Sequence, residues 1–139
     1  MVVGDFGERK IRFLSETAPG SVHDKSLAER TALHFPSDSE LHQDSGFQGY
    51  APPEVQIFQP LKKKRGQERT DEERQHNRLI SQIRIAVEHM LAGVKRARIV
   101  KERFRNTRSG FADLAMLLAC GLHNLRQSFR RPSQSSYFG

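Results

Sequence analysis

The stretch from Thr70 to about Val100 constrains the fold most, because its pattern is that of one long amphipathic helix. Thr70 and Glu73 have the spacing of a capping box, and Asp71 and Glu72 add negative charge at the positive end of the helix dipole. Apolar residues then recur with the spacing of a buried stripe, at Leu79 or Ile80, Ile83, Val87, Met90 or Leu91, and Val94. We therefore expect a helix that packs this stripe against the rest of the chain.

A second line of residues shares one polar face of the same helix: Asn77, Ser81, Arg84, Glu88 and Lys95. Glu88 is the one carboxylate on a face that is otherwise neutral or basic, which marks it as a functional residue. His89 follows it in sequence but points about 100° away around the helix, so it is not expected to act with Glu88 as a ligand.

The rest of the chain alternates between strand and helix patterns. Strands are expected at 2–3 and 10–14 as a hairpin, at 40–44 and at 55–58; helices are expected from 24 to about 33 and from 111 to about 129. This order predicts an α/β fold with helices on a small mixed sheet, over residues 1–131, and a disordered tail at 132–139. A start at the edge of a strand suggests a missing N-terminal part.

Charge is unevenly distributed along the 139 residues. Residues 1–61 have a net charge of −4 and residues 62–139 a net charge of +11. A basic, arginine-rich half suggests a nucleic-acid partner, although a solvated helical surface would have the same composition. The single cysteine, Cys120, lies in an apolar run and is expected to be buried in a protein of a reducing compartment. No apolar run is long enough to cross a membrane, and the N-terminus lacks the pattern of a secretion signal.

Three carboxylates suggest chemistry: Asp24, Asp44 and Glu88. Asp44 ends a predicted strand, and ligand groups gather at the carboxyl ends of strands in open sheets. A carboxylate there and another on a packed helix could hold magnesium, which prefers a few carboxylates and keeps water and phosphate as further ligands. On spacing alone, ordinary surface carboxylates explain these residues better.

Four blocks, in order, resemble the DDE-type transposases, and most closely the bacterial insertion-sequence branch whose nuclease is similar to that of Harbinger elements. They are TAPGSVHDKSL, QDSGFQGY, KKKRG and N-R-x-x-S-x-x-R-x-x-V-E-H, within a similarity that spans about residues 2–131. The resemblance implies an RNase H-like fold and three carboxylates that bind two Mg²⁺ (or Mn²⁺) ions for strand nicking and transfer. The family's second Asp corresponds to Asp44 and its Glu to Glu88, as catalytic and metal-binding residues.

The family's first Asp has no counterpart in this sequence. It lies on the first strand, upstream of the hairpin, and Asp24 is instead interpreted as an acid at the start of a helix. The family's N-terminal helix-turn-helix is also missing. Because that first strand is central in an RNase H-like sheet, its loss would leave unpaired strand edges. We therefore expect marginal stability, or pairing with a second copy or another transposase fragment, and little or no activity of the chain alone.

Basic residues near the helix are the predicted DNA contacts: Lys62, Lys63, Lys64, Arg65, Arg84, Lys95, Arg96, Arg98 and Arg103. Arg84 could equally form an ion pair with Glu88 four residues on, and residues 62–65 could be a solvated linker. The resemblance predicts a truncated transposase that acts on transposon ends and target DNA in the cytoplasm, associated with the nucleoid. The alternatives are a non-catalytic DNA-binding or regulatory remnant and a generic basic helical adaptor.

Overall fold

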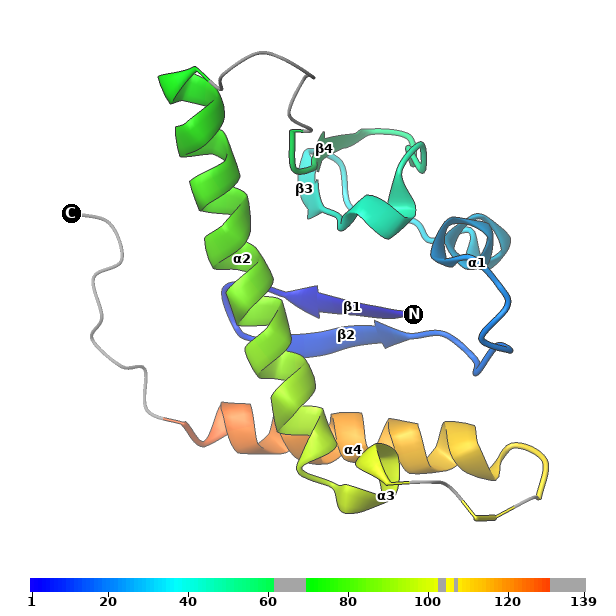
Figure 1. The fold of residues 1–139 in the computed structure, drawn as a ribbon. Helices are drawn as coiled ribbons and strands as arrows, with labels where there is room; N and C mark the ends of the chain where they lie inside the picture. Colours follow the sequence, from blue (N-terminus) through cyan, green and yellow to red (C-terminus); the bar gives the residue numbers. More distant parts are fainter. Residues whose placement is uncertain (62–69, 103–104, 107, 131–139) are drawn as a thin grey trace.

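The computed structural model describes residues 1–61, 70–102, 105–106 and 108–130 (Figure 1). Its elements are β1 (Val2–Asp5), β2 (Lys10–Leu14), α1 (Asp24–Thr31), β3 (Ser39–His42), a 3₁₀ turn η1 (Ser45–Phe47), β4 (Val55–Phe58), α2 (Asp71–Lys95), α3 (Arg98–Lys101) and α4 (Phe111–Ser128). The predicted α/β layout is confirmed. The tail predicted at 132–139 lies outside the described residues.

Helix α2 begins as its sequence predicts. The Thr70 hydroxyl accepts a hydrogen bond from the Glu73 amide, and the Glu73 carboxylate accepts one from the Thr70 amide, each at 3.2 Å. This capping box satisfies two of the amide groups that a helix start leaves free. The predicted helix from 70 to 100 is nevertheless too long, because α2 ends at Lys95 and Ala97 has an extended backbone. The turn there allows Ala97 and Val100 to pack against the core, which a straight helix would not.

The buried stripe of α2 is confirmed in part. Ile80, Met90 and Val94 are buried, and Ala86 joins them. Leu79 and Val87, also in the predicted stripe, are 54% and 41% exposed. The buried line is therefore narrower than the apolar pattern.

Helix α4 closes the outer edge of strand β2. The Asn124 side chain accepts a hydrogen bond from the Ile11 amide and donates one to the Ile11 carbonyl, both at 2.8 Å. One residue earlier, His123 donates from Nε2 to the Arg9 carbonyl at 2.9 Å. An amide side chain thus occupies the place that a neighbouring strand would take, and it satisfies backbone groups that an edge strand leaves unpaired.

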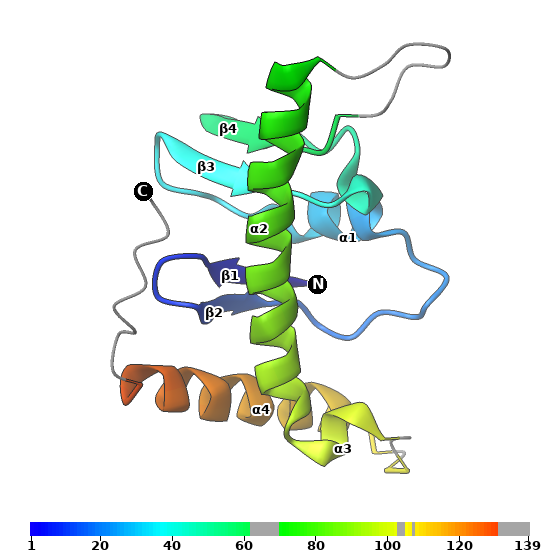
Figure 2. The same cartoon turned by 60° about the vertical axis from the view of Figure 1, so that its left-hand side comes forward.

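The strands form two separate pairs. β1 and β2 are antiparallel, with an irregularity between Val3 and Gly4, and β3 and β4 are parallel in register from Ser39 opposite Val55. Figure 2 shows the pairs one above the other on the same side of α2, with β1 and β3 as the nearer strands. No described strand joins them into one sheet. This arrangement is consistent with an RNase H-like sheet without its central strand.

The core lies where the β1–β2 hairpin, α2 and α4 meet. Its buried cluster consists of Ile11, Met90, Val94, Ala119 and Cys120. Cys120 is 4% exposed, as predicted, and this burial raises the pKa of its thiol. None of the helices in the described part of the chain is long and apolar enough to span a bilayer.

The leucine-rich face of α4 is largely exposed. Leu114, Leu117, Leu118, Leu122 and Leu125 are 47–60% exposed, whereas the buried positions are small or polar: Ala115, Ala119, Cys120 and His123. Small side chains let α4 approach the hairpin and α2 closely enough for Asn124 to reach the β2 backbone. The leucines consequently face away from the core.

Burial predicts which apolar side chains stabilise the fold. Met90 is 3% exposed and its side chain lies against Gly4, so Met90→Ala should lower the free energy of unfolding by about 2–5 kcal/mol through lost packing and a cavity. Leu117→Ala is the matched control: at 59% exposed, it should change that free energy by less than about 0.5 kcal/mol. Urea denaturation followed by circular dichroism measures both, and equal losses would contradict the described core.

Candidate metal and DNA-binding site

Asp44 lies just beyond the strand that was predicted to contain it. The strand expected at 40–44 is β3, which ends at His42. Asp44 instead precedes the 3₁₀ turn η1, where its Oδ1 accepts a hydrogen bond from the Ser45 amide at 2.7 Å. The side chain is exposed, in a turn of small residues at the carboxyl end of β3. A ligand could reach it there.

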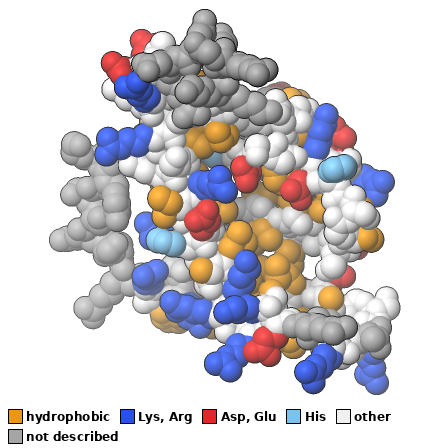
Figure 3. Space-filling view, viewed as in Figure 1, with side chains coloured by type: hydrophobic (Ala, Val, Ile, Leu, Met, Phe, Trp, Pro, Cys, Tyr) orange, Lys and Arg blue, Asp and Glu red, His pale blue; other side chains and the backbone are white. Residues whose placement is uncertain are grey.

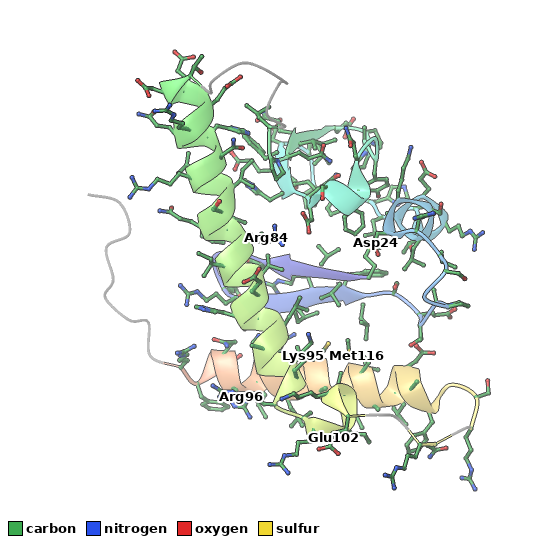
Figure 4. The ribbon with its side chains drawn as sticks, viewed as in Figure 1. Asp24, Arg84, Lys95, Arg96, Glu102 and Met116 are labelled. Atoms are coloured by element: carbon green, nitrogen blue, oxygen red, sulfur yellow. The ribbon has the colours of Figure 1, made fainter. Side chains whose placement is uncertain are left out.

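Asp24 is confirmed as an acid in the first turn of α1. Its carboxylate lies beside the same 3₁₀ turn, since a Cβ placed on Gly46 would come 3.0 Å from Asp24 Oδ2. Helix α1 and the turn after β3 therefore pack together and bring two carboxylate residues to neighbouring positions. In Figure 4, Asp24 lies on α1, to the right of the labelled basic residues of α2.

Glu88 lies in the middle of α2 on its polar face. Its Oε1 is 3.3 Å from Arg84 Nε, and the two side chains are 60% and 62% exposed. The ion pair that sequence spacing allowed is thus formed. The described residues contain no group of three or more acidic, histidine or cysteine side chains placed to hold a metal ion.

The predicted DNA contacts fall into two groups. Arg84, Lys95, Arg96 and Arg98 lie along α2 and into α3, and all are exposed. Figure 4 shows Lys95 and Arg96 at the end of α2 that meets α4, and Figure 3 shows basic side chains over this lower part of the face. Lys62, Lys63, Lys64, Arg65 and Arg103 lie outside the described residues.

The structure adds a basic cavity that the sequence analysis missed. Its volume is about 690 Å³, and its walls come from the hairpin turn, the end of α2 and the end of α4. The arginines among its lining residues are Arg9, Arg96, Arg126 and Arg130. Arg126 and Arg130 are four residues apart, a spacing that could have placed them on one side of a helix end. Nothing in the sequence placed Arg9 beside them.

Sequence comparison identifies the family. Residues 6–124 match the DDE superfamily endonucleases, a range that includes Asp44, Glu88, all of α2 and most of α4. The chain belongs to this family. The chain is 29% identical over 105 residues to a protein of Microchaete diplosiphon named as a probable transposase for insertion sequence element IS702. The aligned part covers 76% of this chain and 38% of the length of that relative. No solved structure matches it.

The exposed ion pair between Arg84 and Glu88 should contribute little to the free energy of unfolding. A double-mutant cycle of Arg84→Ala and Glu88→Ala is expected to give a coupling free energy of about 0.3–0.5 kcal/mol, because water and salt screen exposed charges. The coupling, measured by urea denaturation, should fall further in 1 M sodium chloride. A coupling above about 1.5 kcal/mol that salt does not change would show that the pair is instead a structural element.

Proposed function

We propose that this chain is part of the catalytic domain of an insertion-sequence transposase, which cleaves and joins DNA strands during transposition. The family match over residues 6–124 carries the proposal, because it includes the blocks around Asp44 and Glu88. The name of the relative, a probable insertion-sequence transposase, supports the same activity. DNA, in the form of element ends and target sites, is the proposed substrate, and a nucleoid-associated location in the cytoplasm follows from it.

Asp44 and Glu88 are the proposed metal-binding and catalytic residues. DDE superfamily nucleases generally use divalent metal ions, and Mg²⁺ or Mn²⁺ suits carboxylate ligands. The residues as they lie here do not form a complete site: the Asp44 carboxylate caps the turn at Ser45, and Glu88 pairs with Arg84. Two carboxylates without a third provide too little negative charge and too few oxygens to hold two dications. We therefore infer that the chain alone is inactive or nearly so.

The missing carboxylate is proposed to arrive on a strand from additional polypeptide. β1 and β3 are the nearer strands of two separate pairs, and two-stranded units are marginally stable in water. A strand hydrogen-bonded to both would merge the pairs into one sheet and place its side chains beside the turn after β3. A second copy of the chain or another transposase fragment is the proposed source.

The first experiment measures metal-dependent cleavage by the purified chain. We expect no nicking of supercoiled plasmid above background in 5 mM MgCl₂ or MnCl₂, and calorimetric metal binding that is weak and further reduced by Asp44→Asn or Glu88→Gln. Glu72→Gln, in the exposed first turn of α2, is the matched carboxylate control. Robust nicking that Glu88→Gln abolishes and Glu72→Gln leaves intact would overturn the inference of inactivity.

A second candidate function is DNA binding without cleavage, as a regulatory remnant. The net charge of +11 over residues 62–139 favours it, because such a surface binds the phosphate backbone whether or not a metal site forms. In that case, DNA affinity falls steeply with salt and does not respond to Mg²⁺, Asp44→Asn or Glu88→Gln. Metal-dependent DNA binding that requires both carboxylates supports the catalytic-domain proposal instead.

Open strand edges predict association or a broad unfolding transition. In light scattering coupled to gel filtration, we expect an apparent mass that rises above 15.9 kDa with concentration, or a broad calorimetric melt without association. The exposed leucines of α4 are a second source of association, so Leu118→Gln/Leu122→Gln is the control and should leave strand-edge pairing intact. A sharp two-state melt of a clean monomer would contradict the prediction.

A further inference from the structure

The cavity of about 690 Å³ between α2, α4 and the hairpin turn has a strongly basic lining. Arg9 comes from the turn between β1 and β2, Arg96 caps the end of α2, and Arg126 and Arg130 lie at the end of α4. No aspartate or glutamate is among its lining residues. Three segments far apart in the sequence thus bring four guanidinium groups to one concave surface.

These four charges are not neutralised by neighbouring carboxylates. Within the described part of the chain, none of the four arginines forms an ion pair, in contrast to Arg84, which pairs with Glu88. The acid next to Arg9 in sequence is already engaged, since the Glu8 carboxylate lies 3.0 Å from Lys10 Nζ and 2.9 Å from Arg12 Nη2. The cavity therefore has a net positive charge that a bound anion would balance.

Helix dipoles are the main opposing effect and are too small to cancel this charge. The C-terminal ends of α2 and α4 both lie at the cavity, and each contributes a partial charge of about −0.5. These two partial charges sum to about −1, which one arginine would offset. Three of the four arginines remain in excess, so the arginines are more numerous than helix capping requires.

The inner wall of the cavity is tightly packed around His123, which is 1% exposed. Its Nε2 donates to the Arg9 carbonyl at 2.9 Å and so holds Arg9, whose φ of 55° is in the left-handed region, against α4. Its Nδ1 has no hydrogen-bond partner among the described residues and lies beside Gly93, where a Cβ would collide with the ring. Gly93 and His123 both line the cavity. The arginines therefore surround a tightly packed wall that contains His123 Nδ1, a buried nitrogen without a hydrogen-bond partner among the described residues.

We propose that this cavity binds a phosphate group of the DNA backbone. Guanidinium groups suit phosphate because their planar donors match its oxygens in pairs. The volume lies in the range of small-ligand sites, large enough for a backbone phosphate and its sugar. This proposal rests on DNA being the substrate, and it adds a contact beside the face that contains Glu88.

The position along α2 gives the axial separation of the contact from Glu88. Arg96 follows Glu88 by eight residues, which is about 12 Å along the helix axis. Successive base pairs of B-DNA are about 3.4 Å apart, so in a duplex that ran parallel to α2 the bound phosphate would lie three to four base pairs from the DNA at Glu88. The cavity would thereby anchor the duplex next to the candidate catalytic residue without touching the reacting bond.

The test is the salt dependence of duplex DNA binding, measured by fluorescence anisotropy with a 20-base-pair oligonucleotide. Each lost phosphate contact lowers the slope of log affinity against log salt by about 0.9. Arg96→Gln/Arg126→Gln should therefore lower the magnitude of that slope by about 0.9, because the cavity holds one phosphate group. Both side chains are exposed, so the fold should persist. Circular dichroism melts of both proteins check that it does.

Arg30→Gln is the matched control, because it removes an exposed arginine from α1, away from the cavity. It should leave the slope unchanged. If the wild-type protein binds DNA and the double variant has the same slope as Arg30→Gln, this proposal is overturned. DNA then remains the proposed substrate. No wild-type binding would overturn both. A thermal shift caused by millimolar inorganic phosphate at constant ionic strength, lost in a double variant that still binds DNA normally, would assign the cavity to free phosphate and overturn the proposal.

Discussion

The two hydrogen bonds between Asn124 and the backbone of Ile11 hold the lower half of the molecule together. They join residues 113 positions apart and close the one strand edge that faces α4. An edge strand with free amide and carbonyl groups is a template for pairing with other chains, and an amide side chain is among the few groups that can satisfy a donor and an acceptor at once. Once α4 is fixed on β2, Met90 and Val94 of α2 have a surface to pack on. The hairpin, α2 and α4 therefore form one unit.

The same contact determines where charge gathers. Residue 123 lies next to Asn124, and its ring reaches the Arg9 carbonyl, so the hairpin turn is drawn to the end of α4. Arg9 then meets Arg126 and Arg130, and the end of α2 adds Arg96. The basic cavity is thus a consequence of how the core is closed. By contrast, no hydrogen bond among the described residues joins β1 to β3, and this is where the proposed additional strand would lie.

The local features of the fold could be predicted from sequence, and the nonlocal ones could not. Capping chemistry fixed the start of α2 at Thr70, and alternating apolar residues gave the bounds of β4 at 55–58, because each signal lies within a few residues. The end of α2 depended on what Val94 and Ala97 pack against, and the buried side of α4 depended on small residues that carry little hydrophobic signal. For the site, Asp44 and Glu88 stay predictions, and the Arg84–Glu88 ion pair that the spacing allowed is formed. The cavity required Arg9 and Arg126 to meet, which no spacing rule describes.

For the proposed metal site, the relative position of Asp44 and Glu88 is a larger obstacle than the free energy of their present contacts. The exposed Arg84–Glu88 pair is worth about 0.3–0.5 kcal/mol, less than thermal energy, so a cation with other ligands in place would displace Arg84 readily. The same cation would displace the hydrogen bond that Asp44 accepts from the Ser45 amide, which is worth about 1 kcal/mol. Neither Glu88 nor Asp44 is therefore held strongly by its present partner. Two carboxylates on separate elements nevertheless do not define a metal site by themselves. The segment after β4 is tied to the first half of α2, because Asn77 accepts a hydrogen bond from the Leu61 amide and His76 Nε2 lies 3.1 Å from the Gln59 carbonyl. The proposed strand between β1 and β3 would add a third carboxylate, and with it the position at which a displaced Arg84 could meet a phosphate.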